Sequence, residues 1–150
     1  MGSLAENYYR AARERIEDAN LLHAEGHFPF AMYASGLAVE CLLRAFRLLR
    51  DPHFDARHDL WLLWKGTALA EVKRESSYEH VYNLLGEISV RWRNSYRFVS
   101  ENELRSSLKK SGQDRGIKGD YVKHNSKKLY EAAIEFLRLG GQKWEQLNKK

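Results

Sequence analysis

The sequence predicts an all-α protein that folds as a single domain, and three observations support this prediction. The 150 residues include only 2 prolines and 10 glycines, so helix breakers are scarce outside a few loop positions. Apolar residues recur at spacings of three and four, the period of an amphipathic helix, along most of the chain. A chain of this length also suits one domain that buries roughly two-thirds of its unfolded surface. We therefore expect one helical domain over residues 1–150.

The central element is a predicted helix over residues 28–49, because nearly every side of this segment is apolar. A single narrow polar line interrupts it, formed by Gly36, Glu40, Arg44 and Arg47, which stack on one edge of a helix. Glu40 precedes Arg44 by four residues, the favourable order for a helical ion pair. We expect the other helices to pack around this one.

A first helix is predicted over residues 4–25, where the apolar spacing forms one stripe. Gly26 follows it in the usual C-terminal position, and Pro29 suits the first turn of the next helix. The first two helices should therefore form a tight antiparallel hairpin. His23 and His27 are one helical turn apart by count, but Gly26 separates them and no third ligand is near, so we predict no metal site and no cofactor.

A short helix should follow the loop that begins at Pro52, since proline ends the central helix. His58-Asp59-Leu60 has the composition of a helix start, with Asp59 placed to accept hydrogen bonds from free backbone amides. We expect this motif to have a structural role and not to bind substrate. Gly66 is expected to end or kink the short helix.

A longer helix is predicted from Ser76, which precedes Glu79 by three residues as in a capping box. Its apolar face is expected to continue without interruption through Trp92 to Tyr96. An aromatic stripe at helical spacing is usually core, so both rings should be buried or lie in a dimer interface, although stacking on bases is the alternative.

The C-terminal third begins with a second capping box, Ser100 and Glu103, at the start of a short helix. Residues 111–119 contain three glycines and no apolar period, which predicts a mobile loop. The final helix is predicted over residues 120–139. The two glycines after it are expected to end it and to leave a polar tail over residues 140–150.

Charge is distributed unevenly along the chain. Residues 1–89 contain 10 Lys and Arg against 13 Asp and Glu, whereas residues 90–150 contain 15 against 7. The basic C-terminal part favours an anionic partner, while a solvated basic face is the alternative. No apolar run approaches the roughly 20 residues that span a bilayer and no leader opens the chain, so we expect a cytoplasmic protein without membrane contact. Cys41 is expected to be a small buried hydrophobe.

The order of these motifs resembles the HEPN domain family. The similarity covers roughly residues 5–137 and is carried by Ala38-Val39-Glu40, His58-Asp59-Leu60 and the Trp92-x-x-x-Tyr96-Arg97-Phe98 segment. The resemblance implies an up-and-down bundle of four to five main helices with a short extra helix. It also implies that the domain is a dimer. Domains of this family occur beside nucleotidyltransferases, in toxin–antitoxin pairs and in RNA-cleaving defence proteins.

The ribonucleases of that family carry an arginine, a polar residue directly after it, and a histidine four to six residues after the arginine. Arg93-Asn94 has the right beginning, but Phe98 and Val99 stand where a histidine is needed. We therefore favour a protein without enzymatic activity. The alternative is a metal-independent endoribonuclease, because an arginine can stabilise phosphate charge while a histidine moves a proton. The candidates for such a catalytic site are Arg93, Arg97 and His124.

Cations near the aromatic residues of the basic C-terminal part suggest a phosphate-binding surface. The predicted nucleic-acid or phosphate contacts are Arg91, Arg93, Arg97, Lys123, Lys127 and Lys128. Our leading hypothesis is a non-catalytic HEPN-type module that binds RNA, DNA or a nucleotide, with a nucleotidyltransferase or antitoxin as partner in a toxin–antitoxin or defence system. The alternatives are an RNA-cleaving toxin with an atypical site and a dimeric protein-interaction scaffold. The 4 tryptophans and 8 tyrosines favour a homodimer, since one small core does not easily hide them all.

Overall fold

A computed structural model describes residues 3–54, 57–71 and 77–149, and every regular element within these ranges is a helix. The all-α prediction is therefore confirmed. In chain order the elements are α1 (Leu4–Ala24), α2 (Phe28–Arg50), α3 (Leu60–Lys65), α4 (Ala68–Glu71), α5 (Tyr78–Arg91), the 3-10 helix η1 (Asn94–Arg97), α6 (Glu101–Lys110) and α7 (Tyr121–Leu147). None of the described helices is long and apolar enough to span a bilayer.

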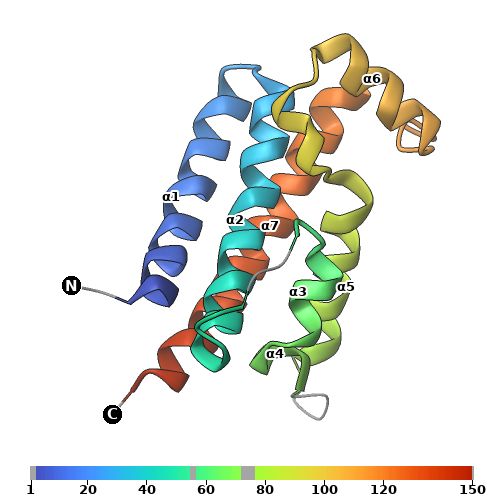
Figure 1. The fold of residues 1–150 in the computed structure, drawn as a ribbon. Coiled ribbons are helices and arrows are strands. Elements are labelled where there is room, and N and C mark those ends of the chain that lie inside the picture. Colours follow the sequence, from blue (N-terminus) through green and yellow to red (C-terminus); the bar gives the residue numbers. More distant parts are fainter. Residues whose placement is uncertain (1–2, 55–56, 72–76, 150) are drawn as a thin grey trace.

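Helix α2 lies at the centre of the bundle, as predicted. It packs against α1, α3, α7 and η1, and Figure 1 shows α1, α2 and α7 side by side. Gly26 connects α1 to α2 with a φ of +80°, a conformation that glycine adopts without steric cost. Helix α6 lies at the end of the bundle away from both chain termini (Figure 1).

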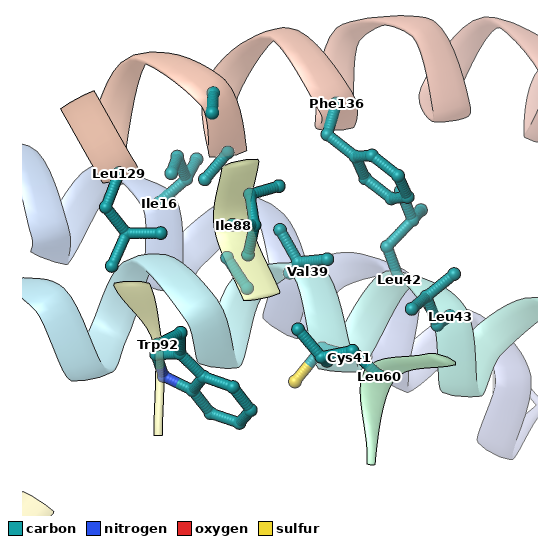
Figure 2. Close-up of a cluster of buried hydrophobic side chains, with 14 of the residues drawn as sticks. Ile16, Val39, Cys41, Leu42, Leu43, Leu60, Ile88, Trp92, Leu129 and Phe136 are labelled. Atoms are coloured by element: carbon teal, nitrogen blue, oxygen red, sulfur yellow. The ribbon is translucent and has the colours of Figure 1, made fainter. Parts of the chain in front are cut away.

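The core is formed by side chains from most of the helices, and Figure 2 shows Leu42 of α2 and Phe136 of α7 pointing toward one another. Cys41 of α2 is buried as expected, and burial raises the pKa of its thiol to about 11. The Glu40–Arg44 ion pair is also present, with Nε 3.1 Å from the carboxylate.

Two of the predicted helix starts are observed. Asp59 caps α3 by accepting a hydrogen bond from the backbone amide of Leu62 at 3.0 Å, and Ser100 caps α6 in the same way through Glu103. The start predicted at Ser76 differs, because the N-cap residue of α5 is Ser77 and its side chain makes no capping hydrogen bond. Ser76 itself lies outside the described residues. Helix α4 was not predicted.

The prediction that one helix continues to Tyr96 is wrong, because α5 ends at Arg91 and the chain becomes extended at Trp92. The indole of Trp92 packs directly on Gly36 of α2, and its Nε1 donates to the carbonyl of Tyr33 at 3.1 Å. Figure 2 shows this ring beside α2. Leaving the helix lets the chain insert the indole into the core before η1 begins. Trp92 and Tyr96 are both buried, so the prediction of core aromatics is confirmed.

The predicted helix end at Gly140-Gly141 is also wrong, because α7 continues to Leu147. A Cβ at Gly140 would lie 2.5 Å from Leu42 Cδ2, and one at Gly141 would lie 3.3 Å from the hydroxyl of Tyr9. The two glycines therefore allow close packing of α7 against α2 and α1. Beyond them Trp144 is buried and stacks on Tyr9 with ring centroids 5.0 Å apart. Residues 140–147 of the predicted polar tail therefore belong to the last helix, and Gly140, Gly141 and Trp144 among them are buried.

The segment over residues 111–119 forms a series of turns and bends between α6 and α7, as expected for a loop. Gly112, Gly116 and Gly119 all have positive φ angles, which explains the three glycines. Asn125 of α7 anchors the turns, since its side-chain amide donates to the carbonyl of Gln113 at 2.9 Å.

Candidate functional site

A cleft lined mostly by polar and charged residues lies between the extended segment after α5 and helix α6. Its volume is about 590 Å³. The residues that line it are Arg93, Val99, Asn102, Glu103, Ser106, Ser107, Lys110 and Ser111. Ligand sites for small molecules commonly have volumes of roughly 300–1,000 Å³, so the cleft has the size of a ligand site.

Helix α6 forms one wall of the cleft. It is amphipathic, with an apolar face toward the core and a polar face toward the cleft. Leu104 and Leu108 are fully buried on the inner face. The lining residues recur at three- and four-residue spacing on the other face. The amphipathic pattern of this short helix therefore presents hydroxyl, amide and ammonium groups to the cleft.

The positive charges of the cleft are Arg93 and Lys110, and Glu103 is the one carboxylate among its lining residues. Among the described residues, the guanidinium of Arg93 has no hydrogen-bond or ion-pair partner. Arg91 differs, because its guanidinium contacts the Glu87 carboxylate at 2.7 Å and the Asn125 side chain at 3.0 Å. Arg93 is thus available to an anionic ligand, while Arg91 already fastens α5 to α7.

Arg93 also lines a second, smaller pocket of about 190 Å³ on the side of α3. The other lining residues are His58, Asp59, Leu60, Trp61, Ser89, Trp92 and Asn94. Arg93 therefore stands between two cavities, one lined mainly by α6 and one that contains a histidine.

His58 of this smaller pocket contacts a buried carboxylate, that of Glu40, which is only 3% exposed. Glu40 accepts from Nε of Arg44 at 3.1 Å and contacts Nδ1 of His58 at 2.8 Å. A carboxylate paired with arginine offers only acceptor atoms, so Nδ1 of His58 must be the protonated nitrogen.

Two buried polar atoms near this pocket have no hydrogen-bond partner among the described residues. They are Oγ of Ser89 and Oδ1 of Asn94, and both residues line the pocket. An unpaired buried polar atom costs about 1–3 kcal/mol, so such atoms are uncommon in folded proteins unless a ligand or water satisfies them. Both residues line the pocket, but these two atoms are themselves shielded from solvent.

The remaining predicted cations lie on different parts of the surface. The guanidinium of Arg97 lies 4.4 Å from the ring centroid of Phe98, which is 75% exposed. Lys123 and Lys127 are exposed on α7 near His23 of α1. The pKa of His23 is lowered, first by burial and then by these two lysines.

The six predicted phosphate contacts therefore do not all face one cleft. Only Arg93 lines it, whereas Arg91 is paired and Lys123 and Lys127 lie toward α1. Lys128 is exposed on α7, and His124 is half-buried on the same helix. No described group of three or more His, Cys, Asp and Glu side chains is placed to hold a metal ion.

Sequence analysis missed the contact between Glu40 and His58. Both residues stood out, Glu40 for its ion pair and His58 for the helix start, but 18 residues separate them. A buried glutamate in an otherwise apolar helix was the available signal, because such a carboxylate requires partners.

The family model of the HEPN domain matches residues 5–113 of the chain. The matched segment extends from α1 to the turns after α6, so it contains both cavities and excludes α7. No curated protein matches the chain. No solved structure matches it either.

Proposed function

The chain belongs to the HEPN domain family, and we propose that it binds single-stranded nucleic acid through the cleft at Arg93. The observation that carries this proposal is that Arg93, which has no hydrogen-bond or ion-pair partner among the described residues, lines two neighbouring cavities. A guanidinium presents a rigid fork of N–H donors that matches the oxygens of a phosphate.

The chemistry of the cleft suits a phosphodiester backbone better than a free carboxylate or an apolar ligand. Lys110 supplies a second positive charge, and three serines and an asparagine supply neutral hydrogen bonds. Glu103 opposes an anion, which leaves a net charge of about +1 along this wall and favours binding of modest strength. Contacts of this kind hold the backbone and carry no base information.

Phe98 adds a surface on which a base can stack. Its ring is 75% exposed, and it directly precedes Val99, which lines the cleft. The guanidinium of Arg97 lies over the ring, 4.4 Å from its centroid. Stacking on aromatic rings contributes about 1–3 kcal/mol per base in single-strand binding proteins.

The histidine of the family's ribonuclease motif is missing after Arg93. Binding of a nucleic-acid backbone needs no catalytic histidine, so the proposal does not depend on that motif. A homodimer, a nucleotidyltransferase or antitoxin partner, a role in defence and a cytoplasmic location stay predictions. A protein-interaction scaffold is the alternative, and it requires no affinity for nucleic acid.

The proposal is tested by fluorescence anisotropy with a short labelled single-stranded RNA at low salt. Replacing Arg93 with alanine should weaken binding by roughly ten- to a hundredfold, as expected for a charged hydrogen bond worth roughly 1.5–3 kcal/mol. Lys127→Ala is the matched control, since it removes one exposed positive charge on the side of α7 near α1. Equal affinities of wild type and Arg93→Ala, or an equal loss in both variants, would contradict the proposal.

A further inference from the structure

We propose that Glu103 recognises guanine in the strand that binds the cleft, by accepting hydrogen bonds from the ring N1–H and the exocyclic amine of that base. This inference rests on the proposed binding function, because contacts between Arg93 and the backbone must first bring the strand to the cleft. It adds a base preference, which phosphate contacts alone cannot supply.

The carboxylate of Glu103 is free to bind a ligand. The residue is exposed and lines the cleft, and its side chain has no hydrogen-bond or ion-pair partner among the described residues. Arg93 and Lys110 line the same cleft, and neither of them is paired with Glu103. The cleft therefore offers a ligand both cationic donors and an anionic acceptor.

A carboxylate in this position selects against a ligand that offers only phosphate oxygens, since like charges repel one another. An ionised carboxylate has two oxygens that accept hydrogen bonds and has nothing to donate. A ligand that presents donors to Glu103 turns this repulsion into a contact. The mixed charge of the cleft thus favours a nucleotide whose base carries the donors and whose phosphate carries the negative charge.

Guanine is the base that matches a carboxylate best. Its N1–H and its exocyclic amine lie side by side on one edge, so they can donate to both oxygens of Glu103. Adenine and cytosine present one amine beside a ring nitrogen that accepts, and uracil presents one N–H between two carbonyls. These edges are accessible in a single strand, where bases are not paired.

The layout of helix α6 agrees with this orientation of a nucleotide. Glu103 and Lys110 are seven residues apart, which places them on the same face of the helix and roughly 10 Å apart along its axis. Ser106 and Ser107 lie between them and also line the cleft. The wall therefore runs from an acceptor at one end to a cation at the other, as a nucleotide runs from its base to its phosphate.

A purely structural role of Glu103 is the alternative, because an acidic residue in the first turn interacts favourably with the helix dipole. Glu101 has the same charge in the same turn of α6. It differs in two respects, since it pairs with Arg105 at 3.7 Å and does not line the cleft. Glu101 is therefore the matched control for Glu103.

The test measures fluorescence anisotropy of the full chain with labelled uridine oligomers that carry one central guanine, adenine, cytosine or uracil. Wild type should bind the guanine oligomer about five- to tenfold more tightly than the others, the lower part of the range for a bidentate base contact. Inosine lacks the exocyclic amine and should lose most of this preference. Deoxyribose oligomers should show the same preference for guanine, whereas a preference for RNA that ignores the base would assign Glu103 to the ribose and overturn the inference.

Glu103→Gln should bring the ratio of guanine to uracil affinity close to one. A carboxamide has a single acceptor and turns an N–H toward one of the guanine donors, while the loss of a negative charge should not weaken binding of the uridine oligomer. Glu101→Gln removes the same charge and should keep the wild-type ratio. Because the ratio is taken within each protein, a partly unfolded variant does not imitate the expected result.

The outcomes separate this inference from the binding proposal. Wild type that binds all oligomers equally, Glu103→Gln that keeps the guanine preference, or an equal loss of preference in both variants would overturn the inference and leave binding at Arg93 intact. Wild type that binds none of the oligomers at low salt would overturn both.

Discussion

Gly36→Ala should destabilise the protein, because the indole of Trp92 occupies the space that a side chain would need. A Cβ built on Gly36 lies 2.0 Å from Cδ1 and 2.2 Å from Nε1 of that ring. Carbon atoms in contact are normally about 3.5–4.0 Å apart, so the indole or the helix must shift by well over an ångström. The shift would also break the hydrogen bond from Nε1 to the carbonyl of Tyr33.

The expected net effect of Gly36→Ala is a loss of about 2 kcal/mol of unfolding free energy. Forcing extra volume into a packed core costs about 1–3 kcal/mol, and the broken hydrogen bond costs about 1 kcal/mol. Alanine offsets roughly 1 kcal/mol of this, because it is the better helix former. For a domain of this size the midpoint temperature should fall by about 4–8 °C.

The matched control is Gly86→Ala in α5. Gly86 also lies inside a helix, but nothing is within 4 Å of its added Cβ, so alanine should stabilise the fold by about 0.5–1 kcal/mol. In urea denaturation the two glycine-to-alanine substitutions should therefore change the free energy of unfolding in opposite directions. A Gly36→Ala protein as stable as wild type would refute the packing of Trp92 on α2.

Two further predictions follow from α7 and from the histidine of α1. Trp144→Ala should cost about 3–5 kcal/mol in urea denaturation, because this ring is a buried part of the core and not of a polar tail; a loss below about 1 kcal/mol would contradict that packing. The pKa of His23 lies below its ordinary value of 6.5 because of burial and then Lys123 and Lys127, so the unfolded chain takes up the proton more readily. The contribution of His23 to the free energy of unfolding should therefore be fully present above pH 6.5 and decrease as the pH falls below it. His23→Asn should flatten this decrease, and equal slopes of stability against pH in the two proteins would refute the linkage.

Capping and helix-ending residues predicted helix boundaries well where the boundary depends only on residues close in the sequence. Gly26 ends α1 and Asp59 caps α3, because each satisfies the backbone groups of its own helix end. The end of α5 was not predictable in this way. It depends on Trp92 meeting Gly36, a contact between residues far apart in the chain. Apolar spacing identifies buried residues but does not show that the backbone leaves the helix between them.

The glycine pair in α7 shows how tertiary packing overrides a local signal. Two successive glycines normally favour the end of a helix, since each lowers helix propensity by about 1 kcal/mol. Here the absence of side chains lets α7 approach Leu42 of α2 and Tyr9 of α1. The buried Trp144, whose ring also lies against Phe46 at 5.4 Å, then stabilises the turns that follow.

The candidate site was predictable in its residue types and less so in its geometry. The sequence pointed to Arg93 as a phosphate contact, and the structure places it between the two cavities. Arg91 seemed equivalent, but Asn125, 34 residues later, accepts a hydrogen bond from its guanidinium. The meeting of His58 with Glu40 likewise depends on how the α3 start folds back on α2. Charge and composition identify candidates, and only the fold decides which of them share a surface.

The most direct test of phosphate binding at Arg93 is the salt dependence of RNA affinity. If Arg93, Arg97 and Lys110 contact phosphates, a plot of log affinity against log salt should have a slope near −2, since each contact releases about 0.7 of a counterion from a single strand. Replacing Arg93 and Arg97 together should weaken binding to all sequences and flatten the slope to about −0.7. No binding by wild type at low salt, or an unchanged slope in the double variant, would contradict the account.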